Sequence, residues 1–205
     1  MALKTVELAP RAPGLSRTLI LLHGYGADEH DLLPMGHELD PRLRVVSLQA
    51  PLSLGGSQRA WFHLTQTPRG LGFDLDEVRA GQAAAVEAVE EIARTAPDPL
   101  LLGFSQGAGM ALGVLLQRPG LVRGVLSLSG VMRALDAAPA AELKGKPVFA
   151  AHGLHDPLIP LSAARALRDE LVQRGLDVTW REYPMAHMVI PQELADARAW
   201  LAGRL

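Results

Sequence analysis

The chain has 205 residues, 48% of them hydrophobic and 20% charged, with a formal net charge of −2 and a pI near 6.4. This charge balance excludes a general nucleic-acid-binding protein, which needs a basic stripe, and no apolar run is long enough to span a membrane. The absence of cysteine excludes disulfides, thiolate nucleophiles and cysteine-ligated metals. We therefore expect one globular domain over residues 1–205.

Strand-length apolar runs alternate with helical patterns along the chain. We expect strands at residues 4–8, 18–22, 44–48, 100–103, 124–128, 148–151 and 178–183. We expect helices at residues 31–39, 76–95, 106–117, 161–174 and 191–204. Several of the strands are apolar throughout, as expected when helices cover both of their faces. The alternation predicts an α/β fold with a mostly parallel, doubly wound sheet.

Residues 50–75 interrupt this alternation, because they are rich in proline and glycine and show little periodicity. Irregular segments of this length are uncommon in compact domains and are often functional. The segment also carries Trp61, Phe62 and Phe73, three of the nine aromatic residues. We expect this segment to fold over the functional site predicted below. There its aromatic side chains would bind substrate by forming an apolar wall for an acyl chain. The alternative is that these aromatics fill a satellite core beneath a loop.

The pentapeptide Gly103-Phe104-Ser105-Gln106-Gly107 lies between a predicted strand and a predicted helix. In that context the G-x-S-x-G pattern is typical of a nucleophile elbow, a strained turn that exposes its serine at the carboxyl end of a sheet. Its two glycines omit the side chains that would collide in the turn. We predict that Ser105 is a catalytic nucleophile. The alternative is a glycine-rich turn that only lets a helix pack closely on a strand.

A serine nucleophile needs a neighbouring base, and the base needs a carboxylate to orient it. On this type of sheet the serine comes first in the chain, then the acid, then the histidine. Asp156 follows the predicted strand at 148–151, and His187 follows the one at 178–183. Ligands bind at such carboxyl ends of strands. We predict catalytic roles for Asp156 and His187. A turn-initiating aspartate and a surface histidine are the alternatives.

An acyl-transfer site also needs donors for its oxyanion. On this type of sheet they are the backbone N–H after the nucleophile and one from an early strand-to-helix loop. The first belongs to Gln106. The second lies in the segment that follows the predicted strand at 18–22, and we assign it to Tyr25, with Gly24 as the alternative.

Polar residues near that loop are assigned structural roles. We expect His23 to be buried and to bond the loop backbone. Asp28, Glu29 and Asp31 stand beside His30 in an arrangement that suggests a metal site. Acidic residues ahead of a helix, however, more often cap it and complement its dipole. We therefore expect neither a metal nor a cofactor.

Four segments of the chain together resemble the phospholipase/carboxylesterase family of small α/β-hydrolases, which includes the acyl-protein thioesterases. These segments are residues 22–28, 103–107, 152–160 and 186–187. The resemblance covers nearly the whole chain. It implies the α/β-hydrolase fold and agrees with the site residues assigned above. The chain departs from the family's thioesterases at Tyr25, where they usually carry leucine, and at Ala186, where they usually carry glycine.

We therefore predict a serine carboxylesterase that hydrolyses carboxylic esters through an acyl-enzyme intermediate. Residues 131–146 are too few for a large cap domain, so we expect an open site for small or medium acyl esters, with thioesters and lysophospholipids left open. The alternatives are an acyl-protein thioesterase or lysophospholipase, and a catalytically silent binding protein with a hydrolase fold.

The expected partner is a small-molecule ester, with no nucleic-acid partner and no integral membrane segment. We expect a monomer or a homodimer. Residues 1–11 lack the apolar core of a signal peptide, which favours a cytoplasmic location.

Overall fold

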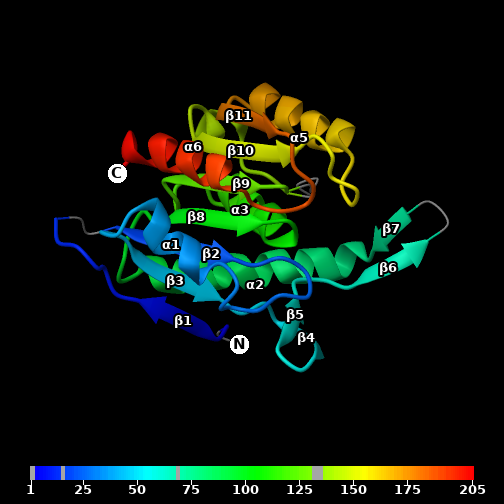
Figure 1. Cartoon of the computed structure of the whole chain (residues 1–205), viewed down its shortest axis with the longest axis horizontal. Helices are drawn as coiled ribbons and strands as arrows, with labels where there is room; N and C mark the ends of the chain where they lie inside the picture. The colour runs from blue at the N-terminus through cyan, green and yellow to red at the C-terminus, as the bar shows by residue number, and fades with distance from the viewer. Residues whose placement is uncertain (1–2, 15–16, 68–69, 131–135) are drawn as a thin grey trace.

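A seven-stranded sheet forms the centre of the computed structural model, which describes residues 3–14, 17–67, 70–130 and 136–205 (Figure 1). The strand order is β1-β3-β2-β8-β9-β10-β11. These strands are β1 (Thr5–Leu8), β2 (Thr18–Leu22), β3 (Arg44–Leu48), β8 (Leu100–Phe104), β9 (Gly124–Leu128), β10 (Pro147–Gly153) and β11 (Asp177–Tyr183). Strand β1 is antiparallel to β3, and all other neighbours are parallel. The predicted mostly parallel sheet is confirmed, with no strand end shifted by more than two residues.

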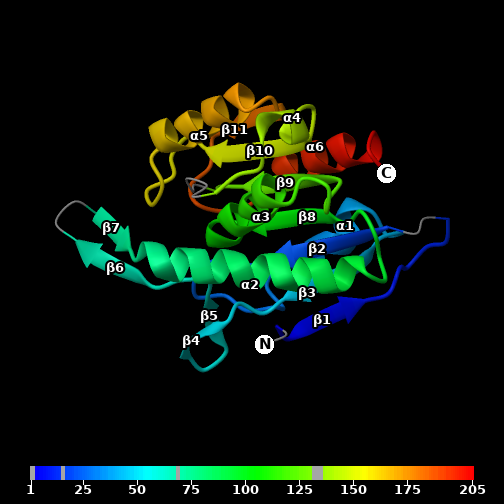
Figure 2. The same cartoon turned by 180° about the vertical axis from the view of Figure 1, so that it is seen from behind.

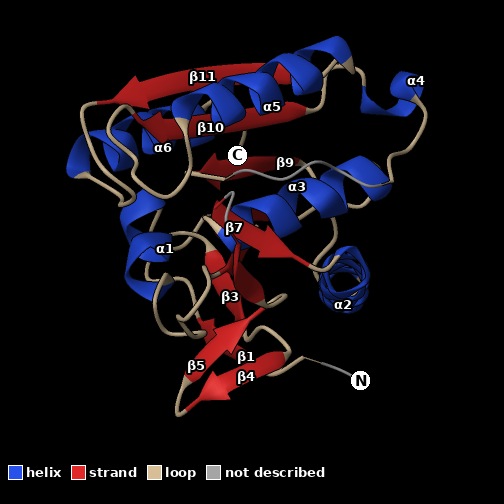
Figure 3. Cartoon of the chain, turned by 90° about the vertical axis from the view of Figure 1, so that its right-hand side faces the viewer, coloured by secondary structure: helices blue, strands red, loops and turns tan. Residues whose placement is uncertain are grey.

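Helices cover both faces of this sheet. They are α1 (Leu33–Leu39), α2 (Leu75–Ala93), α3 (Gln106–Gln117), α4 (Ala140–Leu143), α5 (Leu161–Gln173) and α6 (Pro191–Ala202). Helices α2 and α3 lie on one side and α1 and α6 on the other (Figure 3). The buried side chains accordingly form two cores, one on each face. Among the described residues, no helix has the length and apolarity that a membrane crossing needs.

All five predicted helices are present, and the short α4 was not predicted. It lies in the segment 131–146, of which residues 131–135 are outside the described residues. Helix α2 begins at Leu75 because Asp74 caps it, accepting hydrogen bonds from the N–H groups of Asp76 and Glu77. Gly175 follows the end of α5 and has a positive φ of 87°, as expected for a glycine that ends a helix.

The acidic residues ahead of α1 do not cap it, so that prediction is wrong. The residue at the cap position is Leu32, which makes no side-chain cap. Glu29 is instead buried, and its carboxylate accepts hydrogen bonds at 2.7 Å from Lys4 Nζ and from Gln49 Nε2. Burial raises the pKa of this carboxyl, but the two hydrogen bonds outweigh it and bring the pKa down to about 2. Glu29 thus ties the loop after β2 to the edge of the sheet.

Residues 50–75 form two β-hairpins rather than an irregular loop. The strands are β4 (Leu52–Gly55), β5 (Gln58–Ala60), β6 (Leu64–Thr67) and β7 (Gly70–Phe73), paired β4 with β5 and β6 with β7. The first hairpin turns at Gly55 and Gly56, which have φ of 108° and 55°, a conformation that glycine adopts at little cost. The β6–β7 hairpin projects beyond the start of α2 (Figures 1 and 2).

The sheet brings distant segments together at one point. From β2 the chain moves outward to β3, and it later returns to place β8 on the opposite side of β2. The loops that follow β2 and β8 therefore leave the sheet side by side in opposite directions. Such a switch point is where open α/β sheets bind their ligands.

Candidate active site

Ser105 occupies a sharp turn between β8 and α3, with φ of 54° and ψ of −117°. A positive φ strains a non-glycine residue and is concentrated at functional sites. A Cβ on Gly103 would collide with the Gly107 carbonyl oxygen, and one on Gly107 would collide with the Leu22 carbonyl oxygen. Only glycine fits at these two positions, so the local sequence dictates the expected elbow. The Ser105 N–H donates to the Leu128 carbonyl at 2.9 Å, which ties the turn to β9.

The predicted acid and base lie next to this serine. His187 Nε2 is 2.8 Å from Ser105 Oγ, and His187 Nδ1 is 2.7 Å from Asp156 Oδ2. The loops that carry the acid and the base emerge together because Gly153, at the end of β10, pairs with Tyr183, at the end of β11. Three side chains that are far apart in the sequence thus form one hydrogen-bonded line at the carboxyl edge of the sheet.

The Asp156 carboxylate is fully buried and has partners for both oxygens. Its Oδ1 accepts hydrogen bonds from the N–H groups of Leu158 and Ile159, each at 2.9 Å. Burial raises the pKa of this carboxyl, but hydrogen bonds from Ile159, His187 and Leu158 outweigh it, and the pKa lies below its usual value. The ionised Asp156 therefore accepts the Nδ1–H of His187, which leaves Nε2 as a proton acceptor facing the serine.

The two predicted oxyanion donors are the main-chain N–H groups of Gln106 and Tyr25. Within the described part of the chain, neither the Gln106 N–H nor the Tyr25 N–H donates to another protein group. The Gly24 backbone packs against Ser105, since a Cβ on Gly24 would lie 3.4 Å from the Ser105 Cβ. The loop after β2 therefore lies within reach of a group bound at Ser105.

His23 orients the second donor. Its Nε2 accepts a hydrogen bond from the Ala50 N–H at 3.1 Å, so its Nδ1 carries the proton and donates to the Gly24 carbonyl at 2.8 Å. In a trans peptide the C=O and N–H point in opposite directions, so this bond turns the Tyr25 N–H away from the imidazole. Burial lowers the pKa of His23 and keeps the ring neutral. This geometry favours Tyr25 over Gly24 as the donor.

A cavity of about 590 Å³ opens beside the serine. Ser105, His187, Tyr25 and Gln106 all contribute to its lining. Its remaining walls are mostly apolar, and they are formed by Gly24, Ala27, Asp31, Phe62, Leu64, Gln66, Phe73, Phe104, Leu158, Ile159, Pro160 and Ala163. An apolar chamber of this kind suits the hydrocarbon part of a small-molecule ligand.

The three aromatics of the predicted wall occupy different environments. Phe62 and Phe73 line the cavity and contact each other edge to face, with ring centroids 5.7 Å apart. Trp61 is only 1% exposed and lies in the core between the sheet and α2, outside the cavity lining. Trp61 therefore does not contribute to the predicted apolar wall, and it belongs to a main core of the domain rather than to a satellite core.

The apolar residues Leu158, Ile159 and Pro160 were missed as cavity residues. They follow Asp156 after one residue, Pro157, on a loop that would be expected to be polar. Leu158 remains 57% exposed although it is a large apolar side chain. Consecutive apolar residues immediately after a predicted catalytic acid were the available signal.

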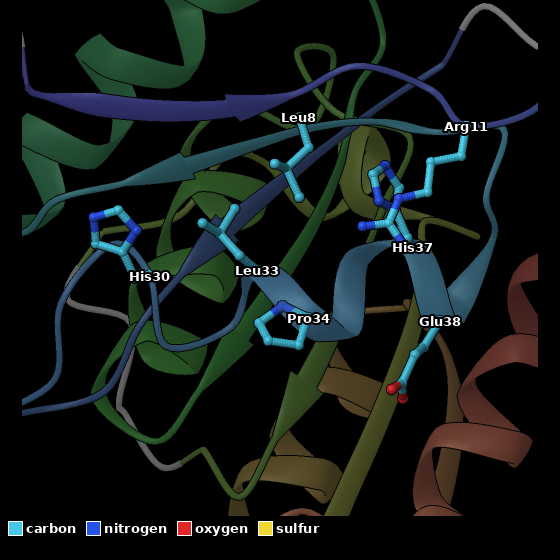
Figure 4. A pocket seen from close by; sticks show the side chains of 7 residues that line it. All are labelled: Leu8, Arg11, His30, Leu33, Pro34, His37 and Glu38. Carbon is cyan, nitrogen blue, oxygen red and sulfur yellow. The ribbon is translucent and has the colours of Figure 1, made fainter.

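A second cavity, of about 500 Å³, lies away from the serine between α1 and the segment that follows β1 (Figure 4). Its lining is Leu8, Arg11, His30, Leu33, Pro34, His37 and Glu38. Among the described residues, its lining includes no serine. The hydrogen-bonded line of Ser105, His187 and Asp156 therefore makes the first cavity the candidate site.

The chain is similar to known hydrolases in sequence and in structure. A family model described as phospholipase/carboxylesterase matches residues 7–204. The chain is 30% identical to the esterase YpfH of Escherichia coli over 184 residues, covering 85% of this chain and 76% of YpfH. It is 26% identical to acyl-protein thioesterase 1 of Gibberella zeae, covering 96% and 94% of the two chains. The structure of a carboxylesterase from Mesorhizobium loti superposes with a TM-score of 0.79 at 28% identity, covering 93% of this chain and 90% of the other.

Proposed function

Since the chain belongs to the phospholipase/carboxylesterase family of hydrolases, we propose that it is a serine carboxylesterase that works through an acyl-enzyme intermediate. The observation that carries this proposal is the continuous line of hydrogen bonds, 2.8 Å from Ser105 to His187 and 2.7 Å from His187 to Asp156. A serine hydroxyl is a weak nucleophile by itself, and this line supplies both the base and the group that orients it.

In the first half of the reaction, His187 Nε2 takes the proton of Ser105 as Oγ attacks the ester carbonyl. The carbonyl oxygen becomes negative and accepts hydrogen bonds from the Tyr25 and Gln106 N–H groups. His187 then donates its proton to the leaving alkoxide, which departs as the alcohol. The acyl group remains on Ser105.

In the second half, His187 takes a proton from water, whose oxygen attacks the acyl carbonyl. The tetrahedral intermediate forms against the same two donors, and its collapse returns the proton to Ser105 Oγ and releases the carboxylic acid. Asp156 stays ionised throughout and stabilises the protonated imidazole.

The cavity supports small or medium acyl groups as the substrate class, because its volume is about 590 Å³ and its walls are largely apolar. Thioesters are a second candidate, supported by the similarity to acyl-protein thioesterase 1 of Gibberella zeae. Kinetics on matched oxygen esters and thioesters of increasing acyl length would distinguish the two. The single domain, the monomeric or homodimeric state and the cytoplasmic location remain predictions.

The direct test is the variant Ser105→Ala, assayed on an aryl ester beside labelling of the wild type with a fluorophosphonate. We expect kcat to fall by about six orders of magnitude, because a triad acts as a unit, and we expect the label on Ser105. The control is Ser162→Ala, on the exposed first turn of α5. Near-normal activity of Ser105→Ala would refute the proposal. A folded wild type that neither labels nor turns over would indicate a silent binding protein.

A further inference from the structure

Residues 59–62, here called the strap, run across both loops that carry the proposed oxyanion donors. At its start, the Arg59 N–H donates to the Ala27 carbonyl and the Gly26 N–H donates to the Arg59 carbonyl, each at 2.9 Å. These two main-chain bonds join the strap to the loop after β2. The strap is therefore attached directly beside Tyr25.

Trp61 links the strap to both loops. Its indole Nε1–H donates to the His23 carbonyl at 3.0 Å, and its main-chain N–H donates to Gln106 Oε1 at 2.8 Å. Gln106 Nε2 in turn donates to the Phe62 carbonyl at 2.8 Å. Trp61 is 1% exposed and Gln106 is 7% exposed, so water does not compete strongly for these bonds.

We propose that Trp61 and the side chain of Gln106 are positioning residues that hold the two oxyanion donors at a defined separation and orientation. The inference rests on the proposed function of Ser105. Gln106 carries one donor on its own main chain, and its carboxamide bonds the strap on both sides of the Trp61–Phe62 peptide. The Trp61 indole holds the His23 carbonyl, and the His23 ring orients the peptide that carries the Tyr25 N–H.

The energetic reason lies in the distance dependence of oxyanion stabilisation. Donors act fully only when they lie about 2.7–3.1 Å from the developing oxyanion, and a displacement of about 1 Å can cost about 100-fold in rate. The two donors come from different loops, after β2 and after β8, so an additional connection must keep them in register. The strap provides that connection through the Trp61 indole and through its two main-chain bonds to the Gln106 carboxamide.

The test compares Trp61→Phe and Gln106→Met with matched controls. Trp61→Phe removes the indole donor and keeps an aromatic ring in the core, while Gln106→Met removes the carboxamide and keeps the main-chain N–H. The controls remove similar groups elsewhere. Trp180→Phe deletes an indole bond to Glu182, and Gln82→Met deletes a buried carboxamide that accepts from Gln117.

Four quantities are measured for each protein: kcat and KM on an aryl ester, the inhibition constant of an aliphatic trifluoromethyl ketone, and the fraction of sites titrated by a fluorophosphonate. Rates are expressed per titrated site, so unfolded molecules do not count. The ketone forms a tetrahedral adduct whose oxyanion needs both donors. A residue with only a structural role would change the titrated fraction and not the kcat of the remaining sites.

We expect Trp61→Phe and Gln106→Met each to lower kcat per titrated site by about 10- to 100-fold, with KM within about twofold. We expect ketone affinity to fall by a similar factor, and we expect both controls to behave like the wild type. Losses no larger than those of the controls, or losses confined to KM, would overturn the proposal. A wild type that fails to label at Ser105 would contradict the proposed function itself, a result distinct from these.

Discussion

At the scale of single residues, the candidate site depends on how one buried carboxylate is bonded. Asp156 has no exposed side-chain surface, yet two N–H groups and the imidazole of His187 satisfy its oxygens. An ionised group in such a place is stable only because its hydrogen bonds replace the lost water. The same bonds fix the direction of the carboxylate, so Asp156 selects the His187 tautomer that leaves Nε2 free to accept the serine proton.

The variant Asp156→Asn tests this arrangement. An amide in place of the carboxylate presents an N–H to His187 Nδ1, which favours the wrong tautomer, and we expect kcat to fall by about 10⁴-fold. Steady-state kinetics on an aryl ester checks this, with circular dichroism to show that the fold is retained. Asp196→Asn is the control, since Asp196 accepts a hydrogen bond from the Tyr183 hydroxyl outside the cavity. If Asp156→Asn kept more than a tenth of the wild-type kcat, the assigned role of Asp156 would be wrong.

At the scale of elements, the β6–β7 hairpin is the part of the chain whose position bears most directly on specificity. Leu64, Gln66 and Phe73 from this hairpin line the cavity, and Phe73 packs edge to face on Phe62. Phe73 nevertheless remains 52% exposed, which is unusual for so large an apolar side chain. An acyl chain that covered this ring would remove apolar surface from water.

Phe73→Ala should therefore shift acyl-length preference and leave the chemistry intact. We expect kcat/KM to fall by about tenfold for esters long enough to reach the hairpin, with little change for acetate esters, because only the longer chains lose the contact. A series of nitrophenyl esters of increasing length measures this. Val172→Ala, at an exposed apolar residue of α5, serves as the control. An equal loss of kcat/KM for all acyl lengths would contradict the role of Phe73 in binding the acyl chain.

At the scale of the whole molecule, two buried glutamates act on stability in opposite directions as the pH changes. Burial raises the pKa of Glu193, in the first turn of α6, to about 8, and the backbone of Ile190 opposes this shift only in part. The folded chain holds this proton while the unfolded chain releases it above its ordinary pKa near 4.5. Stability contributed at Glu193 is thus lost as the pH rises from 4.5 to 8.

Glu29 has the opposite sign, because its folded pKa of about 2 lies below the ordinary value of 4.5. Its hydrogen bonds stabilise the fold above pH 4.5, and that contribution is lost as the pH falls toward 2. Together the two glutamates predict greatest stability near pH 5.

We expect the free energy of unfolding of the wild type to fall by about 2 kcal/mol between pH 5 and pH 7 through Glu193, and we expect Glu193→Gln to remove most of that slope. Urea denaturation at a series of pH values measures it. Glu142→Gln, at an exposed glutamate of α4, is the control and should keep the wild-type slope. A Glu193→Gln protein with an unchanged slope would show that this carboxyl does not set the pH dependence.

Much of the fold and of the candidate site could be predicted from local sequence chemistry. Several strands of the main sheet are continuous apolar runs, and the elbow around Ser105 follows from glycines that no other residue can replace. Chain order and position after predicted strands together identified Asp156 and His187, and the structure brings both within hydrogen-bond distance of their partners. The hairpins within residues 50–75 were missed because short strands with one exposed face carry little apolar periodicity.

The amino-acid sequence by itself determined the alternating elements, the strained serine turn and the identity of the three hydrogen-bonded side chains, since each depends on residues close together in the chain or on their order. Tertiary structure alone decided that Trp61 is buried in the core and bonds the His23 carbonyl, while its neighbour Phe62 lines the cavity. It also decided that Glu29 pairs with Lys4 instead of capping a helix. Those outcomes depend on which distant groups arrive beside each side chain. Which side chains are buried, and which distant groups they pair with, is set when the whole chain packs. Local sequence patterns therefore do not predict either property.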